Sequence, residues 1–234
     1  MKTSEWLDSI FAIYSPVTVL SDRNGKKALR LKHKKLGREI VLITFEDESP
    51  VYDFLKTVRH ENLAEVLDVL KFEDGEAVLE EYLPGMTVAQ VLETGLYDYH
   101  GAKTVMIAVC RALDALHKHG FVYRDLKPEN VLITDEGEIK LIDFDSCRVS
   151  TPEKSYDTVA LGTPGYASPE QYGIKQSDAR SDIYSAGVFL NVMLTGTHPS
   201  EKLAKGRVGR IVLKCTQISP EKRPSSITDL LRML

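Results

Sequence analysis

The chain has 234 residues, of which 30 are Lys or Arg and 34 are Asp or Glu, so its formal net charge is −4. Hydrophobic residues make up 43% of the sequence, which suffices for one or two buried cores and excludes a disordered or collagen-like chain. The three cysteines are widely spaced without a CxxC pair, which indicates neither a disulfide framework nor a zinc site. No apolar run approaches the ~20 residues of a membrane span, and we expect a cytoplasmic protein with no membrane segment in this chain.

The first third of the sequence favours strands. Residues 17–45 contain short β-rich runs separated by the turn dipeptides Asn24-Gly25 and Leu36-Gly37. Strands are also expected at 66–72 and 76–82, on either side of Asp74-Gly75. Between these runs, Ser49-Pro50 predicts the start of a helix of about ten residues. This part of the chain therefore predicts a small antiparallel sheet with one helix.

Beyond Gly85 the apolar residues repeat with helical spacing. Thr87 and Gln90 form a T-x-x-Q capping box at the start of a short helix. Two longer, buried helices are predicted over residues 102–119 and 181–194, and two short ones begin at 219 and 226. The fold class is therefore α+β, with a strand-rich first part and a mainly helical second part.

One pair of segments carries chemistry. Residues 123–130 read Tyr-Arg-Asp-Leu-Lys-Pro-Glu-Asn, and a strand–turn–strand pattern then leads to Asp143-Phe144-Asp145. Phosphoryl transfer needs a carboxylate near the incoming hydroxyl, a cation near the transferred phosphate, and oxygen ligands for Mg²⁺. Asp125, Lys127, Asn130 and Asp143 offer these groups. Any one of the Asp residues alone would more simply be a solvated turn residue, but four suitable residues at this spacing make that reading improbable.

These segments resemble the catalytic loop and the metal-binding segment of the protein kinase family, H-R-D-x-K-x-x-N and D-F-G. Residues 162–170, Asp182 and Arg223 resemble further family positions. The resemblance implies a single bilobal kinase domain over residues 1–234, with an N-lobe over about 1–83 and a C-lobe over about 84–234. It also implies that Glu170 pairs with Arg223 and that Asp182 holds the backbone of the catalytic loop.

The activity implied by the resemblance is Mg-ATP-dependent transfer of the γ-phosphoryl group to Ser or Thr of proteins. Asp125 would act as base, Lys127 would stabilise the transferred phosphoryl group, and Asn130 with Asp143 would hold Mg²⁺. Lys127 together with Thr163 is similar to serine/threonine rather than tyrosine kinases. The stretch 162–170 resembles a platform for a polypeptide, which disfavours a small-molecule substrate.

The N-terminal part departs from the family at two places that matter for ATP. Ile43 falls at the position of the phosphate-binding lysine, and the glycine-rich loop has lost its pattern. One interpretation is a pseudokinase scaffold that binds nucleotide weakly or not at all. The other is that Lys26, at the position of the third loop glycine, replaces the missing lysine, as in the similar with-no-lysine kinases. Asp53 is then the candidate partner of Lys26, with Glu48 as the alternative.

The resemblance also implies an adenine site between the lobes. Ala28, Val41 and Leu132 would stack on the base, and the backbone from Glu81 to Leu83 would form hydrogen bonds with it. Glu80 would occupy the gatekeeper position, where a buried carboxylate needs a partner.

Residues 22–38 contain eight Lys or Arg and a single acid, so this hairpin is either solvated or attracts a polyphosphate or an acidic partner. It lacks interleaved aromatic residues, and we expect no nucleic-acid partner. The loop 146–161 offers phosphorylation sites, of which Thr158 is the first candidate. The sequence leaves the oligomeric state open.

Overall fold

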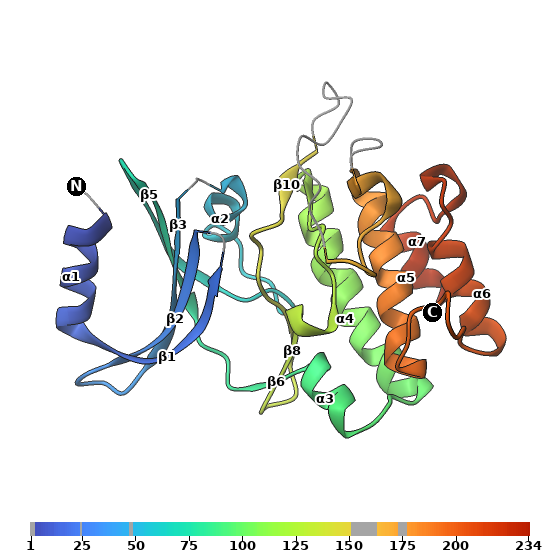
Figure 1. The fold of residues 1–234 in the computed structure, drawn as a ribbon, viewed down its shortest axis with the longest axis horizontal. Coiled ribbons are helices and arrows are strands. Elements are labelled where there is room, and N and C mark those ends of the chain that lie inside the picture. The colour runs from blue at the N-terminus through green and yellow to red at the C-terminus, as the bar shows by residue number, and fades with distance from the viewer. Residues whose placement is uncertain (1–2, 24, 47–48, 151–162, 173–176) are drawn as a thin grey trace. The chain divides into compact units, whose positions relative to one another are not determined.

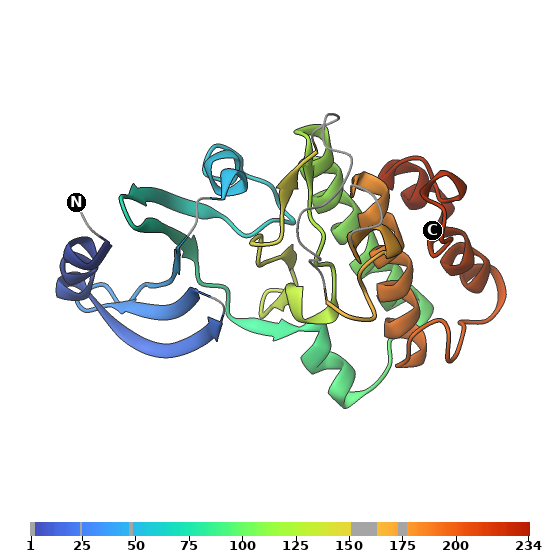
Figure 2. The same cartoon turned by 45° about the horizontal axis from the view of Figure 1, so that its top comes forward.

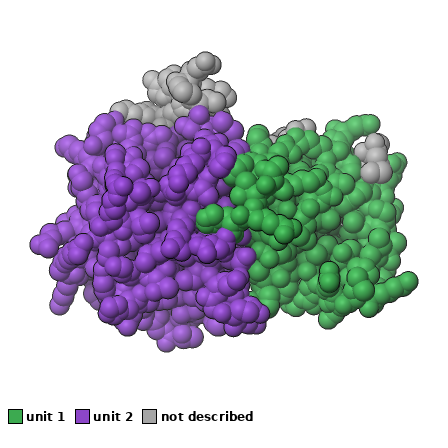
Figure 3. All heavy atoms as spheres, turned by 180° about the vertical axis from the view of Figure 1, so that it is seen from behind, with its two compact units in different colours: residues 1–60, 64–84 green, residues 61–63, 85–234 purple. Residues whose placement is uncertain are grey.

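The computed structural model describes residues 3–23, 25–46, 49–150, 163–172 and 177–234. The chain forms two compact units: residues 1–60 with 64–84 make unit 1, and residues 61–63 with 85–234 make unit 2 (Figure 3). Within the described residues, no helix is both long and apolar enough to cross a membrane. The fold is that expected, mixed α+β, with an antiparallel sheet in unit 1 and mainly helices in unit 2 (Figure 1).

Unit 1 is built on a five-stranded antiparallel sheet with the strand order β1-β2-β3-β5-β4 (Figure 1). The strands are β1 (Tyr14–Arg23), β2 (Lys26–His33), β3 (Glu39–Phe45), β4 (Val66–Phe72) and β5 (Gly75–Glu81). Arg23 pairs with Lys26, so the first hairpin turns at residues 24–25 as predicted. Lys32 pairs with Glu39 across the second hairpin, whose turn contains Gly37 at a φ of +70°.

The third hairpin turns one residue earlier than the sequence predicts. Phe72 pairs with Gly75, so the two turn residues are Glu73 and Asp74. Gly75 has a φ of +147°, and a Cβ atom on it would lie 2.1 Å from the backbone oxygen of Phe45. Glycine is therefore required here because the end of β3 approaches closely, and not because the residue forms the turn.

A helix that the sequence reading missed, α1 (Thr3–Ile13), packs on one face of this sheet. Its Trp6 joins Leu31, Leu42 and Ala77 in a buried cluster. The Nζ atom of Lys34 donates to the backbone oxygens of Phe11 and Ala12, at 2.6 and 3.1 Å. A cation at the last carbonyls of a helix satisfies acceptors that lack intrahelical partners. The sheet thus has one face covered by α1.

The predicted helix after Ser49 is shorter than expected. The helix α2 runs over Pro50–Leu55, six residues, with Pro50 at its first turn as predicted. Ser49 occupies the N-cap position, but its side chain makes no capping hydrogen bond. Its backbone N–H instead donates to Glu76 Oε2 at 3.3 Å, and Glu76 is fully buried. The buried carboxylate of β5 therefore binds the backbone of the N-cap residue, and the serine hydroxyl does not cap the helix.

Unit 2 is mainly helical, with α4 and α5 side by side at its centre (Figures 1 and 2). Its helices are α3 (Val88–Thr94), α4 (Tyr99–Lys118), α5 (Ala179–Thr195), α6 (Gly206–Cys215) and α7 (Ile227–Met233). The capping box of Thr87 and Gln90 is present, and the buried faces of α4 and α5 confirm their predicted core positions. The helix α6 was not predicted from the sequence, and residues 220–222 form a 3-10 turn rather than the predicted helix.

Short strands and turns complete unit 2. They are β6 (Gly85–Thr87), β7 (Phe121–Val122), η1 (Pro128–Asn130), β8 (Val131–Thr134), β9 (Ile139–Leu141), β10 (Arg148–Val149), η2 (Pro169–Tyr172) and η3 (Pro220–Lys222). Residues 61–63 belong to this unit because they form hydrogen bonds with β9. The N–H of Leu141 donates to Asn62 O at 2.9 Å, and Leu63 forms an isolated parallel β-bridge with Leu141. The loop from β7 through η1 to β8 carries the predicted catalytic residues.

Candidate active site

A buried carboxylate of α5 binds the backbone of the loop after β7. Asp182 is fully buried, and it accepts hydrogen bonds from the backbone N–H groups of Tyr123 (2.9 Å) and Arg124 (2.7 Å). His117 Nε2 lies 2.7 Å from the same carboxylate. The expected role of Asp182 is confirmed. No sequence signal points to this contact of His117, because no spacing links it to a residue 65 positions away.

Three side chains contact the carboxylate of Asp125. Thr163 Oγ1 donates to Asp125 Oδ1 at 2.6 Å. Lys127 Nζ donates to Asp125 Oδ2 at 2.7 Å and to Thr163 Oγ1 at 2.9 Å. Asn130 Nδ2 donates to Asp125 Oδ2 at 3.0 Å and to its backbone oxygen at 2.9 Å. The cluster thus combines one carboxylate, one ammonium, one amide and one hydroxyl within hydrogen-bond distance, and all four residues lie in unit 2.

The segment that contains Asp143 runs beside this cluster. The backbone N–H of Ile142 donates to Asn130 O at 3.0 Å, which brings Asp143 next to the end of η1. Asp143 has a φ of +62°, a left-handed conformation that is uncommon for a residue other than glycine. Among the described residues that are not glycine, only Arg124 shares this property. Asp145, which stands where the family usually has glycine, does not have a positive φ.

Tyr123 takes the place of the usual histidine of this loop. Its ring packs edge-on against Phe144, with 6.0 Å between ring centroids, and its hydroxyl donates to Ile142 O at 2.6 Å. Burial raises the pKa of Tyr123 well above its ordinary value, and the nearby Asp143 carboxylate adds to the effect. The residue therefore stays neutral and supports the Asp143 segment.

A buried ion pair fixes the end of the segment that carries Thr163. Arg223 Nη1 and Nη2 donate to the two carboxylate oxygens of Glu170 at 2.6 and 2.9 Å, and Ser181 Oγ donates to the same carboxylate at 2.8 Å. Burial opposes the ionisation of Glu170, but these hydrogen bonds outweigh it and lower its pKa below the ordinary value. The predicted pairing of Glu170 with Arg223 is confirmed.

In unit 1, the register places several predicted nucleotide-binding residues on one face of the sheet. Ala28 pairs with Ile43, which in turn pairs with Val78. Since side chains alternate along a strand, Lys26 and Val41 share this face, opposite the one that α1 covers. Ile43 is buried, and the Nζ atom of Lys26 lies 5.8 Å from the ring centroid of Phe45. Lys26 therefore stands on the same sheet face as the residue that replaces the usual lysine.

The predicted pairing of Asp53 with Lys26 is wrong in this structure. Asp53 Oδ2 binds Lys71 Nζ at 2.7 Å. The reason is the strand order: α2 packs against β4, which carries Lys71, whereas Lys26 lies three strand spacings away on β2, roughly 14 Å at ~4.8 Å per strand. The alternative partner, Glu48, lies outside the described residues, as does the candidate phosphorylation site Thr158.

The remaining predicted adenine contacts belong to both units. Leu83 is half-buried in unit 1, and Leu132 is buried on β8 of unit 2. The backbone N–H of Glu81 donates to Glu65 O at 3.0 Å, and its side chain accepts the N–H of Glu65 at 2.9 Å. The N–H of Glu81 is therefore already used within unit 1. Glu80, at the gatekeeper position, is buried.

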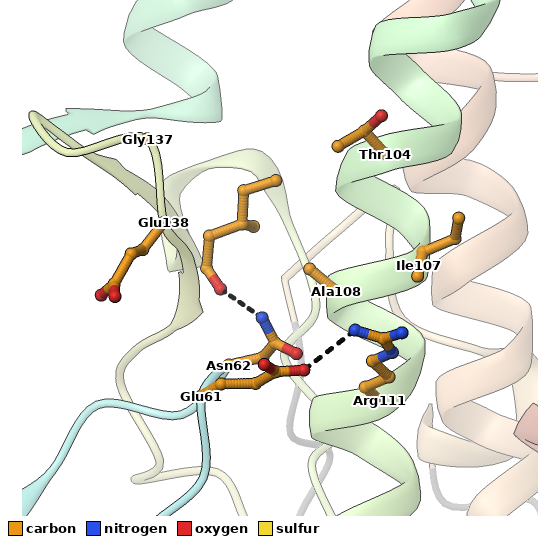
Figure 4. A pocket seen from close by; sticks show the side chains of 9 residues that line it. Glu61, Asn62, Thr104, Ile107, Ala108, Arg111, Gly137 and Glu138 are labelled. Atoms are coloured by element: carbon orange, nitrogen blue, oxygen red, sulfur yellow. Dashed lines mark hydrogen bonds and ion pairs between the residues drawn. The ribbon is translucent and has the colours of Figure 1, made fainter.

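Unit 2 also has a small hollow of about 320 Å³ (Figure 4). It lies between α4, residues 61–62 and the β8–β9 turn. Arg111 Nη1 contacts Glu61 Oε1 at 2.9 Å, and Asn62 Nδ2 donates to Ile139 O at 2.9 Å (Figure 4). None of the predicted catalytic or metal-binding residues lines it. Its contacts explain instead how residues 61–63 are attached to unit 2.

Comparison with known proteins agrees with this geometry. Residues 26–233 match the model of the protein kinase domain, so the chain belongs to the protein kinase family.

Its curated relatives include bacterial and eukaryotic kinases. A probable serine/threonine-protein kinase from Clostridium perfringens is 32% identical over 207 residues, which cover 86% of this chain and 30% of the relative. The serine/threonine-protein kinase PknL of Mycobacterium tuberculosis is 42% identical over 121 residues, 51% of this chain and 30% of the relative. A probable myosin light chain kinase from Dictyostelium discoideum is 31% identical over 209 residues, 87% of this chain and 56% of the relative. The aligned part of the chain thus spans only about a third to a half of the length of these relatives.

Proposed function

We propose that this protein is an active serine/threonine protein kinase that transfers the γ-phosphoryl group of Mg-ATP to protein hydroxyls. The observation that carries the proposal is the hydrogen-bonded cluster of Asp125, Lys127, Asn130 and Thr163. A scaffold without catalysis has no need to hold these groups together. The names of the relatives, most of which are serine/threonine-protein kinases, support the same class of activity.

The cluster supports the following division of work. The substrate hydroxyl gives its proton to the Asp125 carboxylate as its oxygen attacks the γ-phosphorus, and the bond from that phosphorus to the β-phosphate oxygen breaks. Lys127, which already contacts both Asp125 and Thr163, offsets negative charge on the transferred group. The hydrogen bond from Thr163 keeps one carboxylate oxygen of Asp125 oriented until the substrate hydroxyl arrives.

The donor set of Asn130 and Asp143 fits Mg²⁺. The two residues supply an amide oxygen and a carboxylate, and hard oxygen ligands of this kind are those that Mg²⁺ takes together with substrate phosphates. Asn130 uses its Nδ2 atom for Asp125, so Oδ1 is the atom that would ligate the metal. When bound, Mg²⁺ would neutralise charge on the phosphates. Lys26 is our candidate for the phosphate contact that Ile43 cannot make.

The test is a transfer assay with purified protein, labelled ATP, Mg²⁺ and a generic basic protein, with Asp143→Asn as control. We expect label on serine or threonine of the acceptor, lost when Mg²⁺ is chelated and in the Asp143→Asn variant. Absence of transfer from wild-type protein whose unfolding temperature still rises with Mg-ATP would refute the enzymatic activity but not nucleotide binding. Absence of both effects would refute nucleotide binding as well.

A further inference from the structure

Gln171 follows Glu170 in the chain, yet its side chain contacts the catalytic loop. The residue is fully buried, and its Nε2 atom donates to the backbone oxygen of Arg124 at 2.8 Å. Arg124 directly precedes Asp125, so this oxygen belongs to the peptide group that joins the two residues. We propose that Gln171 is a positioning residue that fixes this peptide group and, through it, the carboxylate of Asp125. The inference rests on the proposed kinase function.

The orientation of the Gln171 amide is determined by its other end. Its Oε1 atom accepts hydrogen bonds from the backbone N–H and from the Oγ atom of Ser168, both at 3.0 Å. An amide nitrogen in that place would face a backbone donor, which cannot accept a hydrogen bond. The nitrogen must therefore point toward Arg124. Ser168, which stands where the kinase pattern has alanine, supplies the hydroxyl donor of this arrangement.

The contact acts on a strained part of the backbone. Arg124 has a φ of +71°, and a residue other than glycine keeps such a conformation only where its surroundings hold it. Its N–H donates to Asp182 Oδ1 at 2.7 Å, and its carbonyl oxygen accepts from Gln171. Both backbone polar groups of Arg124 are thus held by side chains that are themselves fully buried. Loss of the Gln171 donor would allow the peptide group before Asp125 to rotate.

The same segment therefore holds Asp125 at two points. Thr163 contacts the carboxylate directly, and Gln171, eight positions further along, holds the backbone that carries it. The contact of Gln171 is with the backbone next to Asp125, the proposed base, and not with a residue that we propose to bind ATP. Loss of the contact should consequently slow phosphoryl transfer without weakening ATP binding, because a small displacement of a catalytic group costs rate.

The test compares Gln171→Met with a matched control, Asn191→Leu. Methionine has a similar length but lacks the amide donor. Asn191 is another fully buried amide of unit 2: its Nδ2 donates to three acceptors between residues 195 and 202, and its Oδ1 accepts from Ala204 N–H. None of these partners belongs to the catalytic loop. Both substitutions therefore remove buried hydrogen bonds, but only the first removes a contact to Arg124.

Both variants would be assayed at a temperature where circular dichroism shows them folded. We expect Gln171→Met to lose about 10- to 100-fold in kcat with the KM for ATP within about twofold of wild type. Asn191→Leu should keep kcat per folded molecule within about twofold. Equal losses in the two variants, or an unchanged kcat in Gln171→Met, would overturn the proposal. If Gln171→Met does not fold, Ser168→Ala provides a milder variant with a smaller loss of kcat in the same direction.

Amide hydrogen exchange gives a readout that does not depend on activity. Peptides that cover residues 121–127 should exchange faster in Gln171→Met than in wild type, and should be unchanged in Asn191→Leu. Unchanged exchange in Gln171→Met would overturn the positioning role even if the protein is an active kinase. A different outcome is faster exchange in Gln171→Met although the wild-type protein transfers no phosphoryl group. That result would support the positioning contact and refute the proposed function.

Discussion

The two units differ in how they hold the residues at the positions of the kinase catalytic pattern. In unit 2, the carboxylate of Asp125 has three side-chain partners, and the loop that carries it is anchored by Asp182. In unit 1, the position of the phosphate-binding lysine is occupied by the buried Ile43, and the acid expected to pair with its substitute binds Lys71. The proposed base therefore lies in a hydrogen-bonded network, whereas the proposed phosphate contact rests on one half-buried lysine, Lys26, at the start of β2. The difference shows that the residues matching the kinase catalytic loop are held by several contacts in unit 2, whereas the departures that concern ATP lie in unit 1.

The largest effect is expected where unit 2 depends on one buried ion pair. Arg223→Met leaves the Glu170 carboxylate buried without its guanidinium, and breaking a buried pair in this way costs about 3–5 kcal/mol of unfolding free energy. Urea denaturation of the variant measures it. The surface pair of Arg111 with Glu61 provides the control, since Arg111→Met should cost under about 1 kcal/mol. Similar losses in both variants would contradict the structural role of Arg223.

Lys26→Met tests whether unit 1 still contacts the phosphates. We expect kcat/KM for ATP to fall about 100-fold, or about 2.7 kcal/mol, because the cation proposed for that contact is removed. The unfolding temperature should change little, since Lys26 is only half-buried. Lys27→Met is the matched control: it is the next residue, its side chain lies on the opposite sheet face, and its ion pair with Asp22 is exposed and long at 3.8 Å. Full activity in Lys26→Met would refute its proposed role.

The pH dependence of stability should reveal the Glu170 pair without removing the arginine. Its pKa is lowered below the ordinary 4.5, so the folded state favours the ionised form. The corresponding stabilisation is complete above about pH 4.5 and is lost as the pH falls through the pKa of the folded state. The free energy of unfolding should therefore fall more steeply from pH 6 to pH 3 in wild type than in Glu170→Gln. Parallel curves would show that other carboxylates account for the acid sensitivity.

The smallest effect is expected at the helix that covers the sheet of unit 1. Lys34→Met removes the ammonium from the last carbonyls of α1 and should cost about 0.3–1 kcal/mol of unfolding free energy. Lys35→Met, at the neighbouring exposed lysine, is the control and should change stability by less than about 0.5 kcal/mol. Phosphotransferase activity should be unaffected in both variants. A loss of activity in Lys34→Met would link α1 to the catalytic function.

Local signals predicted most of the secondary structure correctly. The hairpin at Asn24-Gly25, the capping box of Thr87 and the long helix α4 all follow from residues within one turn or one hairpin of each other. The helix α6 was missed because Gly206 and Gly209 are poor helix formers. Gly209 is required by packing, since a Cβ atom there would lie 2.0 Å from Ala204 O. Here tertiary contact overrides local preference.

By itself, the sequence determined the class of the protein and the approach of Lys127 and Asn130 to Asp125, because these three residues lie within six positions of one loop. The resemblance to the kinase family also predicted two distant contacts, Glu170 with Arg223 and Asp182 with the catalytic loop, whereas only the tertiary structure decided the others. The strand order separates Lys26 from Asp53, and folding brings Gln171 to Arg124 and His117 to Asp182. These pairings depend on how strands and helices pack, and no spacing along the chain specifies a contact between residues of separate elements.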